Sequence, residues 1–347
     1  MDRRILTLGE ENANIGRMTG TLAVRAHHAA TLDSKRRVEY RELPAVRLLN
    51  RCSSDRVPFE WTLNPYRGCE FGCKYCYARY THEFMEFHDS LAFERLIFAK
   101  HWSEAALRAE LRRVRPGEWI ALGTATDPYQ PAERRYRLTR RILSVFAGLA
   151  GYNLGITTKS DLVADDAELL RRVSERNNLR VTLTITTADA ALARLLEPMA
   201  PRPDLRFGAL RRLADAGVSC GVTVSPVMPG INDSRDSIDA VAREAKRHGA
   251  RYFQGHVVFL QPSAAAVFLP FLEREFPHLS RAYLEHFSRS AYIRGEYPER
   301  IQDLIREVRA EHGLEGGAAW QPLVEQASFD FGAQQAATPF RVMSVCR

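Results

Sequence analysis

Three cysteines lie within eight residues in the first quarter of the chain. They are Cys69, Cys73 and Cys76 in the run NPYRGCEFGCKYCYAR, and their spacing is C-x3-C-x2-C. Three thiolates this close in the chain can bind three of the four irons of a cubane iron–sulfur cluster. The fourth iron then keeps an open position, as the metal of a catalytic zinc site does, and can bind a substrate or cofactor.

The residues between and beside these cysteines suit a loop that wraps a metal cluster. Gly68 and Gly72 allow the backbone to curl closely around the metal. Tyr75 and Tyr77 supply aromatic walls that limit access of solvent and thereby tune the reduction potential.

Two other interpretations of the cysteines remain open. In the first, they form a zinc knuckle with a fourth ligand such as His82. Zinc sites typically draw paired C-x2-C arms from two separate places, and this sequence has no second pair. In the second, the cysteines are unrelated core residues, which the polar neighbours Glu70, Lys74 and Arg79 disfavour.

The remaining cysteines, Cys52, Cys220 and Cys346, are scattered along the chain. The N-terminus has no apolar signal core, and no apolar run approaches the roughly 20 residues that a bilayer span needs. We therefore expect a cytoplasmic protein without membrane contact, holding a metal site in a reducing compartment rather than a disulfide framework. Cys220 lies in the apolar run VSCGVTV and is expected in the core.

Composition and charge limit the class of protein. The 347 residues are 45% hydrophobic and 26% charged, which is typical of a globular chain with one or two domains. The net charge of +7 permits a polyanionic partner such as nucleic acid without requiring one.

A strand–helix unit of roughly 30 residues repeats through the middle of the chain. Strands are expected at 61–64, 118–124, 153–159, 180–187, 218–225 and 252–260. The helices between and after them are expected at 134–150, 165–177, 204–216, 234–248, 264–276, 281–290 and 299–312. Such alternation predicts an α/β fold with a parallel sheet and right-handed crossovers. Six units favour an open, partial barrel, and a doubly wound sheet is the alternative that periodicity does not exclude.

The pattern also suggests how the chain is divided. Residues 1–57 are expected to form an N-terminal extension with one short strand near 40–43, and residues 58–262 the barrel. Residues 263–312 form a helical segment, and 313–347 a loosely packed tail rich in Gly, Ala and Gln.

The expected strands end in polar residues, although their bodies are apolar. The ends are Thr124–Asp127, Thr157–Ser160, Thr184–Thr187, Ser225–Pro226 and Leu260–Gln261. Single residues of this kind are often helix caps or turn formers. In barrel enzymes, however, the chemistry lies at the carboxyl ends of the strands, and five coincident polar ends predict a shared cavity there.

The cysteine motif resembles that of the radical S-adenosylmethionine (radical SAM) superfamily. The flanking sequences resemble the branch related to spore photoproduct lyase, whose members are often labelled DNA repair photolyases. The resemblance covers roughly residues 57–262 and is carried by TATDPYQPAERR, TTKSDL, VTLTITTAD, LEPMAPRP and SPVMPGIND. It implies a partial (β/α)6 barrel of the TIM type.

The resemblance also implies a set of site residues. Cys69, Cys73 and Cys76 would bind a [4Fe–4S] cluster whose fourth iron takes the amino and carboxylate groups of S-adenosylmethionine. The residues implied to contact this cofactor are Tyr77, Thr126, Lys159 and Thr184. The point charge of Lys159 suits the methionine carboxylate, and Asp127 is a weaker candidate for a ribose hydroxyl or a neighbouring arginine.

The reaction implied by the resemblance is reductive cleavage of S-adenosylmethionine. An electron from a flavodoxin- or ferredoxin-type donor would produce methionine and a 5′-deoxyadenosyl radical, which abstracts hydrogen from an unidentified substrate, with nucleic acid as a candidate. The enzyme would be lyase- or transferase-like. The alternative is a non-enzymatic protein that binds zinc or nucleic acid.

The sequence departs from the resembled branch at one position. Spore photoproduct lyase has a hydrogen-donating cysteine near the end of the second strand, where this chain has Thr124. A hydroxyl is a far poorer hydrogen-atom donor than a thiol, so we expect a different reaction. A tyrosine such as Tyr75 or Tyr129, or another cysteine such as Cys346, would have to replace it if a donor is needed.

Five arginines stand within eight residues at the start of the helix expected at 134–150. They would form either a phosphate-binding face or the solvated outer face of a barrel helix. We favour the solvated face, with Leu138, Ile142 and Leu143 pointing inward, because only Tyr136 is interleaved as an aromatic platform.

Overall fold

The computed structural model describes residues 21–35, 37–45, 47–52 and 57–316. Its main sheet has seven strands in the order β11-β10-β9-β8-β7-β4-β3. Six of them are parallel, namely β4 (Trp61–Leu63), β7 (Trp119–Leu122), β8 (Asn153–Thr158), β9 (Asn178–Thr184), β10 (Cys220–Val227) and β11 (Tyr252–Val257). The six expected strands are thereby confirmed.

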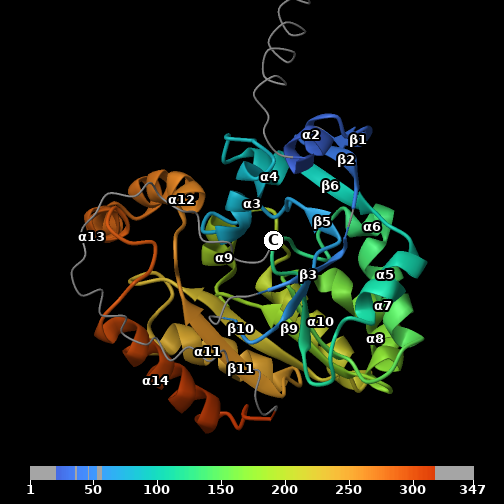
Figure 1. Cartoon of the computed structure of the whole chain (residues 1–347). Helices are drawn as coiled ribbons and strands as arrows, with labels where there is room; N and C mark the ends of the chain where they lie inside the picture. The colour runs from blue at the N-terminus through green and yellow to red at the C-terminus, as the bar shows by residue number, and fades with distance from the viewer. Residues whose placement is uncertain (1–20, 36, 46, 53–56, 317–347) are drawn as a thin grey trace, which may run out of the picture.

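The order of the strands distinguishes between the two candidate architectures. Each parallel strand pairs with the next one along the chain, so the strand order never reverses as it does in a doubly wound sheet. Among the described residues, β11 and the antiparallel β3 (Leu49–Arg51) are the outermost strands and do not pair with each other, so the barrel is not closed. The partial barrel is confirmed (Figure 1).

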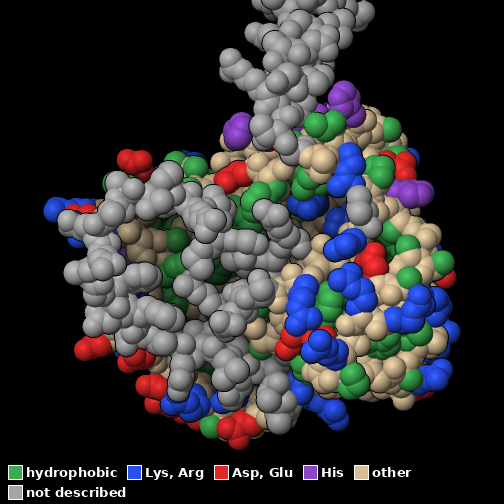
Figure 2. Space-filling view, viewed as in Figure 1, with side chains coloured by type: hydrophobic (Ala, Val, Ile, Leu, Met, Phe, Trp, Pro, Cys, Tyr) green, Lys and Arg blue, Asp and Glu red, His purple; other side chains and the backbone are tan. Residues whose placement is uncertain are grey.

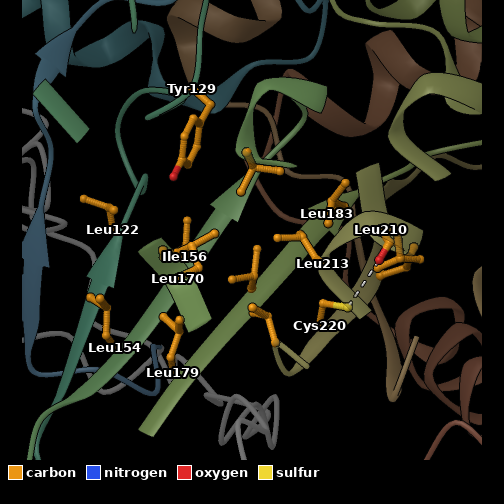
Figure 3. Packing of buried hydrophobic residues seen from close by; sticks show 14 of the residues in the cluster. Leu122, Tyr129, Leu154, Ile156, Leu170, Leu179, Leu183, Leu210, Leu213 and Cys220 are labelled. Carbon is orange, nitrogen blue, oxygen red and sulfur yellow. Dashed lines mark hydrogen bonds between the residues drawn. The ribbon is translucent and has the colours of Figure 1, made fainter. Parts of the chain in front are cut away.

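One face of the main sheet is apolar and is covered by helices. These are α7 (Leu138–Ala147), α8 (Ala167–Ser174), α10 (Pro203–Asp215) and α11 (Arg235–Arg247). Because side chains alternate along a strand, Leu154 and Ile156 of β8 reach the same side. Figure 3 shows them packed with Leu170 of α8 and with Leu210 and Leu213 of α10.

The opposite face of the sheet is polar. Thr182 Oγ1 lies 3.0 Å from Tyr252 Oη, and Thr223 Oγ1 lies 2.7 Å from Ser225 Oγ. The Ser225 hydroxyl in turn lies 3.1 Å from Nδ1 of His256. These residues alternate with buried apolar ones such as Val181 and Val222, so the two faces of the sheet differ sharply in polarity.

The N-terminal segment holds more structure than the single strand expected. It forms α2 (Thr21–His27), β1 (Thr31–Lys35) and β2 (Val38–Pro44), of which β2 contains the expected strand. A second sheet has the order β1-β2-β6-β5, with β5 (Tyr66–Arg67) and β6 (Leu96–His101) coming from beyond the extension. Because β2 pairs with β6 far along the chain, the local residue pattern carries little sign of this sheet.

The helix expected at 134–150 is broken, which corrects the prediction. α6 (Glu133–Tyr136) ends at Arg137, whose φ of 51° places it in the left-handed region. The Glu133 carboxylate accepts hydrogen bonds from the backbone N–H groups of Thr139 and Arg140, at 3.1 and 3.0 Å. A side chain of one helix thus caps the start of the next, α7. The inward-facing positions Leu138, Ile142 and Leu143 are buried as predicted.

The helix expected at 165–177 begins differently from the prediction. A 3₁₀ helix, η2 (Asp161–Asp166), precedes α8, and Ser160 caps it by accepting a hydrogen bond from Leu162 N at 3.3 Å. Asp166 does not cap α8, because its carboxylate accepts the Tyr129 hydroxyl and pairs with Arg140.

The remaining helices surround the sheet edges and the cysteine loop. They are α3 (Tyr80–Glu83), α4 (Ala92–Arg95), α5 (Glu104–Leu111), α9 (Ala190–Leu196), α12 (Pro262–Glu275), α13 (Pro277–Phe287) and α14 (Glu296–Glu311). α14 packs on β11 through Ile305, whose side chain lies against Gly255. Within the described ranges, no helix is long and apolar enough to span a membrane. Most of the expected tail, residues 317–347, lies outside the described residues.

Packing between the sheet and its helices predicts a large cost for a cavity at the centre. Ile156→Ala should lower the free energy of unfolding by about 3 kcal/mol, because the side chain is fully buried between β8 and its neighbours. Chemical denaturation measures the change. Leu284→Ala on α13, where the leucine is 55% exposed, is the control and should change stability little. Equal effects of the two substitutions would contradict the packing described.

Candidate functional site

The three clustered cysteines lie together on the loop between β5 and the 3₁₀ helix η1 (Tyr77–Arg79). Cys69, Cys73 and Cys76 are free thiols. Burial raises the pKa of Cys73 to about 12 and also raises the pKa values of Cys69 and Cys76. Thiols that are neutral for this reason lose their protons when a metal binds, so the donor set fits a metal cluster.

The spread of the thiols favours several metal ions over one. Within the described part of the chain, no three His, Cys, Asp or Glu side chains converge closely enough to hold a single metal ion. In a cubane, each thiolate binds a different iron. The geometry therefore suits an iron–sulfur cluster better than a zinc knuckle.

The proposed zinc ligand His82 has a different role. Its Nε2 lies 3.0 Å from the backbone oxygen of Leu96, and its ring packs against Phe93 and Phe98. Burial lowers the pKa of His82 to about 4, so the ring is neutral near pH 7. His82 is a core residue beneath the cysteine loop, and the zinc interpretation loses its fourth ligand.

The backbone at Gly68 fastens the start of the cysteine loop. Gly68 has φ of +80°, and a Cβ there would lie 2.6 Å from the Leu96 oxygen, so only glycine fits. The Gly68 oxygen accepts hydrogen bonds from Thr126 Oγ1 at 2.5 Å and from Gln130 Nε2 at 2.9 Å. Thr126, predicted to contact a cofactor, therefore holds the loop to the carboxyl end of β7.

A buried ion pair fastens the middle of the loop. Glu197 and Arg206 are both about 1% exposed or less, and Arg206 also donates to the backbone oxygens of Thr184 and Pro201, at 2.9 and 2.8 Å. The hydroxyl of Tyr75, which lies between Cys73 and Cys76, donates to the Glu197 carboxylate. Burial opposes ionisation of Glu197, but the charges of Arg206 and Lys159 hold its pKa below the ordinary value.

Lys159 stands at the carboxyl end of β8, beside the cysteines. Its Nζ lies 5.6 Å from the centre of the Tyr75 ring. Burial alone would lower the pKa of Lys159, but its acidic neighbours Cys73 and Glu197 raise it overall, so the side chain is a cation. Its backbone N–H donates to Asp127 at 2.7 Å, and Asp127 also accepts the Thr158 hydroxyl at 2.6 Å. Both oxygens of Asp127 are thus already used within the protein.

Tyr77 and Thr184 come from the cysteine loop side and from the end of β9, respectively. The Tyr77 hydroxyl donates to the backbone oxygen of Thr124, and its ring lies 5.1 Å from that of Phe259. Thr184 ends β9 and is in register with Thr223 on the polar face of the sheet. Among the residues predicted to bind the cofactor, Lys159 is the one whose charge interacts with those of the clustered cysteines.

The tyrosines considered as hydrogen donors are held by carboxylates. Tyr75 donates to Glu197, and Tyr129 donates to Asp166 at 3.1 Å inside the helix-covered core (Figure 3). Cys220 is a core residue, as predicted, with its thiol directed at the Leu210 oxygen at 3.7 Å. Cys52, which follows β3, is buried. Cys346 lies outside the described residues.

Sequence reasoning missed the residues that hold the loop. These are Glu197, Arg206 and Gln130. Glu197 and Gln130 lie within the motifs LEPMAPRP and TATDPYQPAERR, which carry the family resemblance but indicate no role for either side chain. The available signal for Glu197 was its charge, because it directly follows the apolar helix end ALARLL.

Comparison with known proteins agrees with this geometry. The family described as "Radical SAM superfamily" matches residues 63–245. An uncharacterized protein of Mycobacterium tuberculosis is 32% identical over 84% of this chain and 86% of its own length. An uncharacterized protein of Methanocaldococcus jannaschii is 28% identical over 63% of this chain and 77% of its own length.

A solved structure shares the fold. A spore photoproduct lyase mutant with bound AdoMet and dinucleoside spore photoproduct superposes with a TM-score of 0.60. The match covers 88% of this chain and 91% of that one, at 14% sequence identity. At 14% sequence identity, the similarity shows a shared fold and nothing more.

The buried ion pair predicts a large loss of stability when one charge is removed. Arg206→Leu should lower the free energy of unfolding by about 3–5 kcal/mol, because it leaves Glu197 buried and uncompensated. The double variant Glu197→Gln/Arg206→Leu should lose less. Denaturant titration measures both, with the exposed Arg202→Leu as the control that should barely change stability. A double variant less stable than Arg206→Leu alone would contradict a compensating pair.

The neutral state of His82 predicts a pH dependence of stability. The folded pKa of about 4 lies below the ordinary value of 6.5, so the unfolded chain binds more protons between these values. Stability should therefore fall as pH decreases from 6.5 to 4, by at most about 1.4 kcal/mol per pH unit from this residue. His82→Gln should show a shallower decline in urea denaturation across that range. An unchanged slope would show that His82 is not neutral in the folded protein.

Proposed function

Because the chain belongs to the radical SAM superfamily, we propose that Cys69, Cys73 and Cys76 hold a [4Fe–4S] cluster and that its open iron binds S-adenosylmethionine. Membership of the superfamily implies radical chemistry that cleaves S-adenosylmethionine. The observation that carries the site assignment is the placement of three free thiols, of which Cys69 and Cys73 are buried and Cys76 is half-buried, beside the cation Lys159.

The chain's own residues would bind and orient the cofactor. Lys159 supplies a fixed positive charge suited to the methionine carboxylate. Tyr77 directly follows Cys76, and Thr184 ends β9 on the polar face of the sheet, and we assign both to the adenosine portion. Thr126 acts at one remove, because its hydroxyl donates to the Gly68 oxygen and so holds the loop.

When bound, the cluster and S-adenosylmethionine together supply the electron transfer and bond cleavage that generate a hydrogen-abstracting radical. The protein excludes water from this chemistry. Phe71 of the cysteine loop packs with Phe268 and Leu272 of α12, which close the loop on one side. With Thr124 hydrogen-bonded to Asn64 at 3.1 Å, and Tyr75 and Tyr129 bound to carboxylates, we infer a reaction that does not return hydrogen from these residues.

We propose nucleic acid as the substrate-bearing partner, on the evidence of one charged surface. Exposed arginines gather over β3, α5, α6 and α7, and we call this surface the arginine face. Its members are Arg47, Arg51, Arg112, Arg113, Arg115, Arg134, Arg137 and Arg141. Figure 2 shows Lys and Arg outnumbering Asp and Glu on this side of the molecule.

The acidic residues near this face are mostly occupied elsewhere. Glu110 accepts the backbone N–H groups of Leu48 and Leu49, and Glu133 is buried. The guanidinium groups of Arg51 and Arg113 lie on the ring of Trp61, at 5.3 and 5.6 Å. Arg51 also forms an ion pair with Glu118 at 3.5 Å. Guanidinium groups held against an aromatic ring suit phosphate oxygens.

The cluster assignment predicts which cysteines are essential. Replacing Cys69, Cys73 or Cys76 by Ala should abolish formation of 5′-deoxyadenosine from S-adenosylmethionine, because each would remove one ligand of the cluster. Anaerobic reconstitution, reduction and chromatography of the products measure this. Cys220→Ala is the matched control, since that thiol lies in the core, and it should retain product formation. Activity that survives loss of any clustered cysteine would show the assignment to be wrong.

The arginine face predicts salt-dependent binding of nucleic acid. The triple variant Arg112→Gln, Arg113→Gln and Arg141→Gln should bind a fluorescent 20-mer DNA duplex at least about tenfold more weakly. The slope of log K against log salt should become shallower by about 1 for each phosphate that the variant no longer neutralises. Fluorescence anisotropy measures both quantities.

The control for this experiment carries the same loss of charge elsewhere. Arg274, Arg281 and Arg306 are exposed arginines that each pair with an acid on α12, α13 or α14. Their replacement by Gln should leave binding close to that of the unmodified protein. If both triple variants weaken DNA binding equally, the loss of affinity follows from net charge alone, and the arginine face is not a specific binding surface.

A further inference from the structure

Glu70 is a buried carboxylate within the cysteine loop, directly after Cys69. Its side chain is 4% exposed, and its backbone N–H donates to Gln130 Oε1 at 3.1 Å. The carboxylate forms an ion pair with Lys35, which ends strand β1 of the N-terminal hairpin. A side chain from the far end of the second sheet thus reaches the loop that carries the thiols.

The surroundings of Glu70 leave Lys35 as its compensating charge. Tyr40 of β2 and Tyr136 of α6 face the same carboxylate, and burial together with the negative charge of Glu70 raises the pKa of Tyr40. The Oε1 atom of Glu70 and the hydroxyl of Tyr136 are buried without a hydrogen-bond partner in the described ranges. In the same ranges, Lys35 is the one cation in an ion pair with Glu70.

The hairpin is held in place by more than this contact. Strand β2 pairs with β6 from Glu39 to Pro44, and Asp33 of β1 forms an ion pair with Arg135 of α6. Loss of the Lys35 charge would therefore leave most of the hairpin attached. Lys35 differs from these other contacts because it places a positive charge beside Glu70, the residue that follows Cys69.

We propose that Lys35 and Glu70 are positioning residues that set the reduction potential of the cluster. The proposal rests on the proposed function, in which Cys69 binds one of the irons. The cluster accepts one electron on reduction, so an uncompensated negative charge on the loop that holds it makes reduction less favourable. Lys35 cancels the charge that the loop carries at Glu70, and the N-terminal hairpin thereby becomes part of the redox site.

Removing the charge of Lys35 and removing the charge of Glu70 should shift the midpoint potential of the cluster in opposite directions. Lys35→Gln leaves Glu70 uncompensated and should shift the midpoint potential to more negative values. Glu70→Gln leaves Lys35 uncompensated and should shift it to more positive values. The double variant removes both charges, so its midpoint potential should lie near that of the unmodified protein. Redox titration of the reconstituted full chain, followed by the electron paramagnetic resonance signal of the reduced cluster, measures each potential.

A purely structural role predicts a different pattern. If the pair only fastens the hairpin, both single variants and the double variant should admit water and shift the potential in the same direction, which would overturn the proposal. Arg135→Gln is the matched control, because it loosens the same hairpin without touching Glu70. Arg135→Gln should leave the midpoint potential unchanged. A shift as large as that of Lys35→Gln would also overturn the proposal.

Hydrogen exchange of the protein before reconstitution separates this proposal from the cluster assignment. Lys35→Gln should raise the exchange of amides in residues 31–35 and 68–76, while those of β8 and β9 stay protected. Unchanged exchange in both segments would show that Lys35 does not contact the loop and would overturn the proposal without any cluster. Failure of the unmodified protein to assemble a cluster, with the exchange result as expected, would instead overturn the proposed function and limit Lys35 to fastening the loop.

Discussion

The ion pair between Glu197 and Arg206 is the interaction on which the site depends. Two charges taken out of water are costly unless each is fully partnered, and here each is. Their partners include Tyr75 of the cysteine loop and the backbone at the end of β9. The pair therefore joins the metal-binding loop to the barrel at a point where neither could shift without exposing a buried charge.

The two faces of the main sheet have different roles. The helix-covered face is mostly apolar, and its packing stabilises the fold. The other face carries Thr, Ser, Tyr and His side chains that hydrogen-bond to one another. The polar face lies beside the loop that carries the three free thiols, so the stabilising core is kept apart from the residues proposed to bind the cofactor.

The sequence was informative where the pattern is local. Alternating apolar residues located six parallel strands, and the spacing of three cysteines located the loop. Features that depend on distant partners were missed. The β2–β6 pairing joins segments more than fifty residues apart, and the break at Arg137 arises because Glu133 caps the next helix. The contact of Lys35 with Glu70 likewise follows only from the fold of the hairpin.

The central claim is that three thiolates on one fastened loop bind a cluster with one iron left open. Mössbauer spectroscopy of protein reconstituted with ⁵⁷Fe, before and after addition of S-adenosylmethionine, tests it most directly. The account predicts that one iron in four changes its spectrum on addition of the cofactor, while the other three do not. Four irons that respond alike, or a spectrum that the cofactor leaves unchanged, would contradict it.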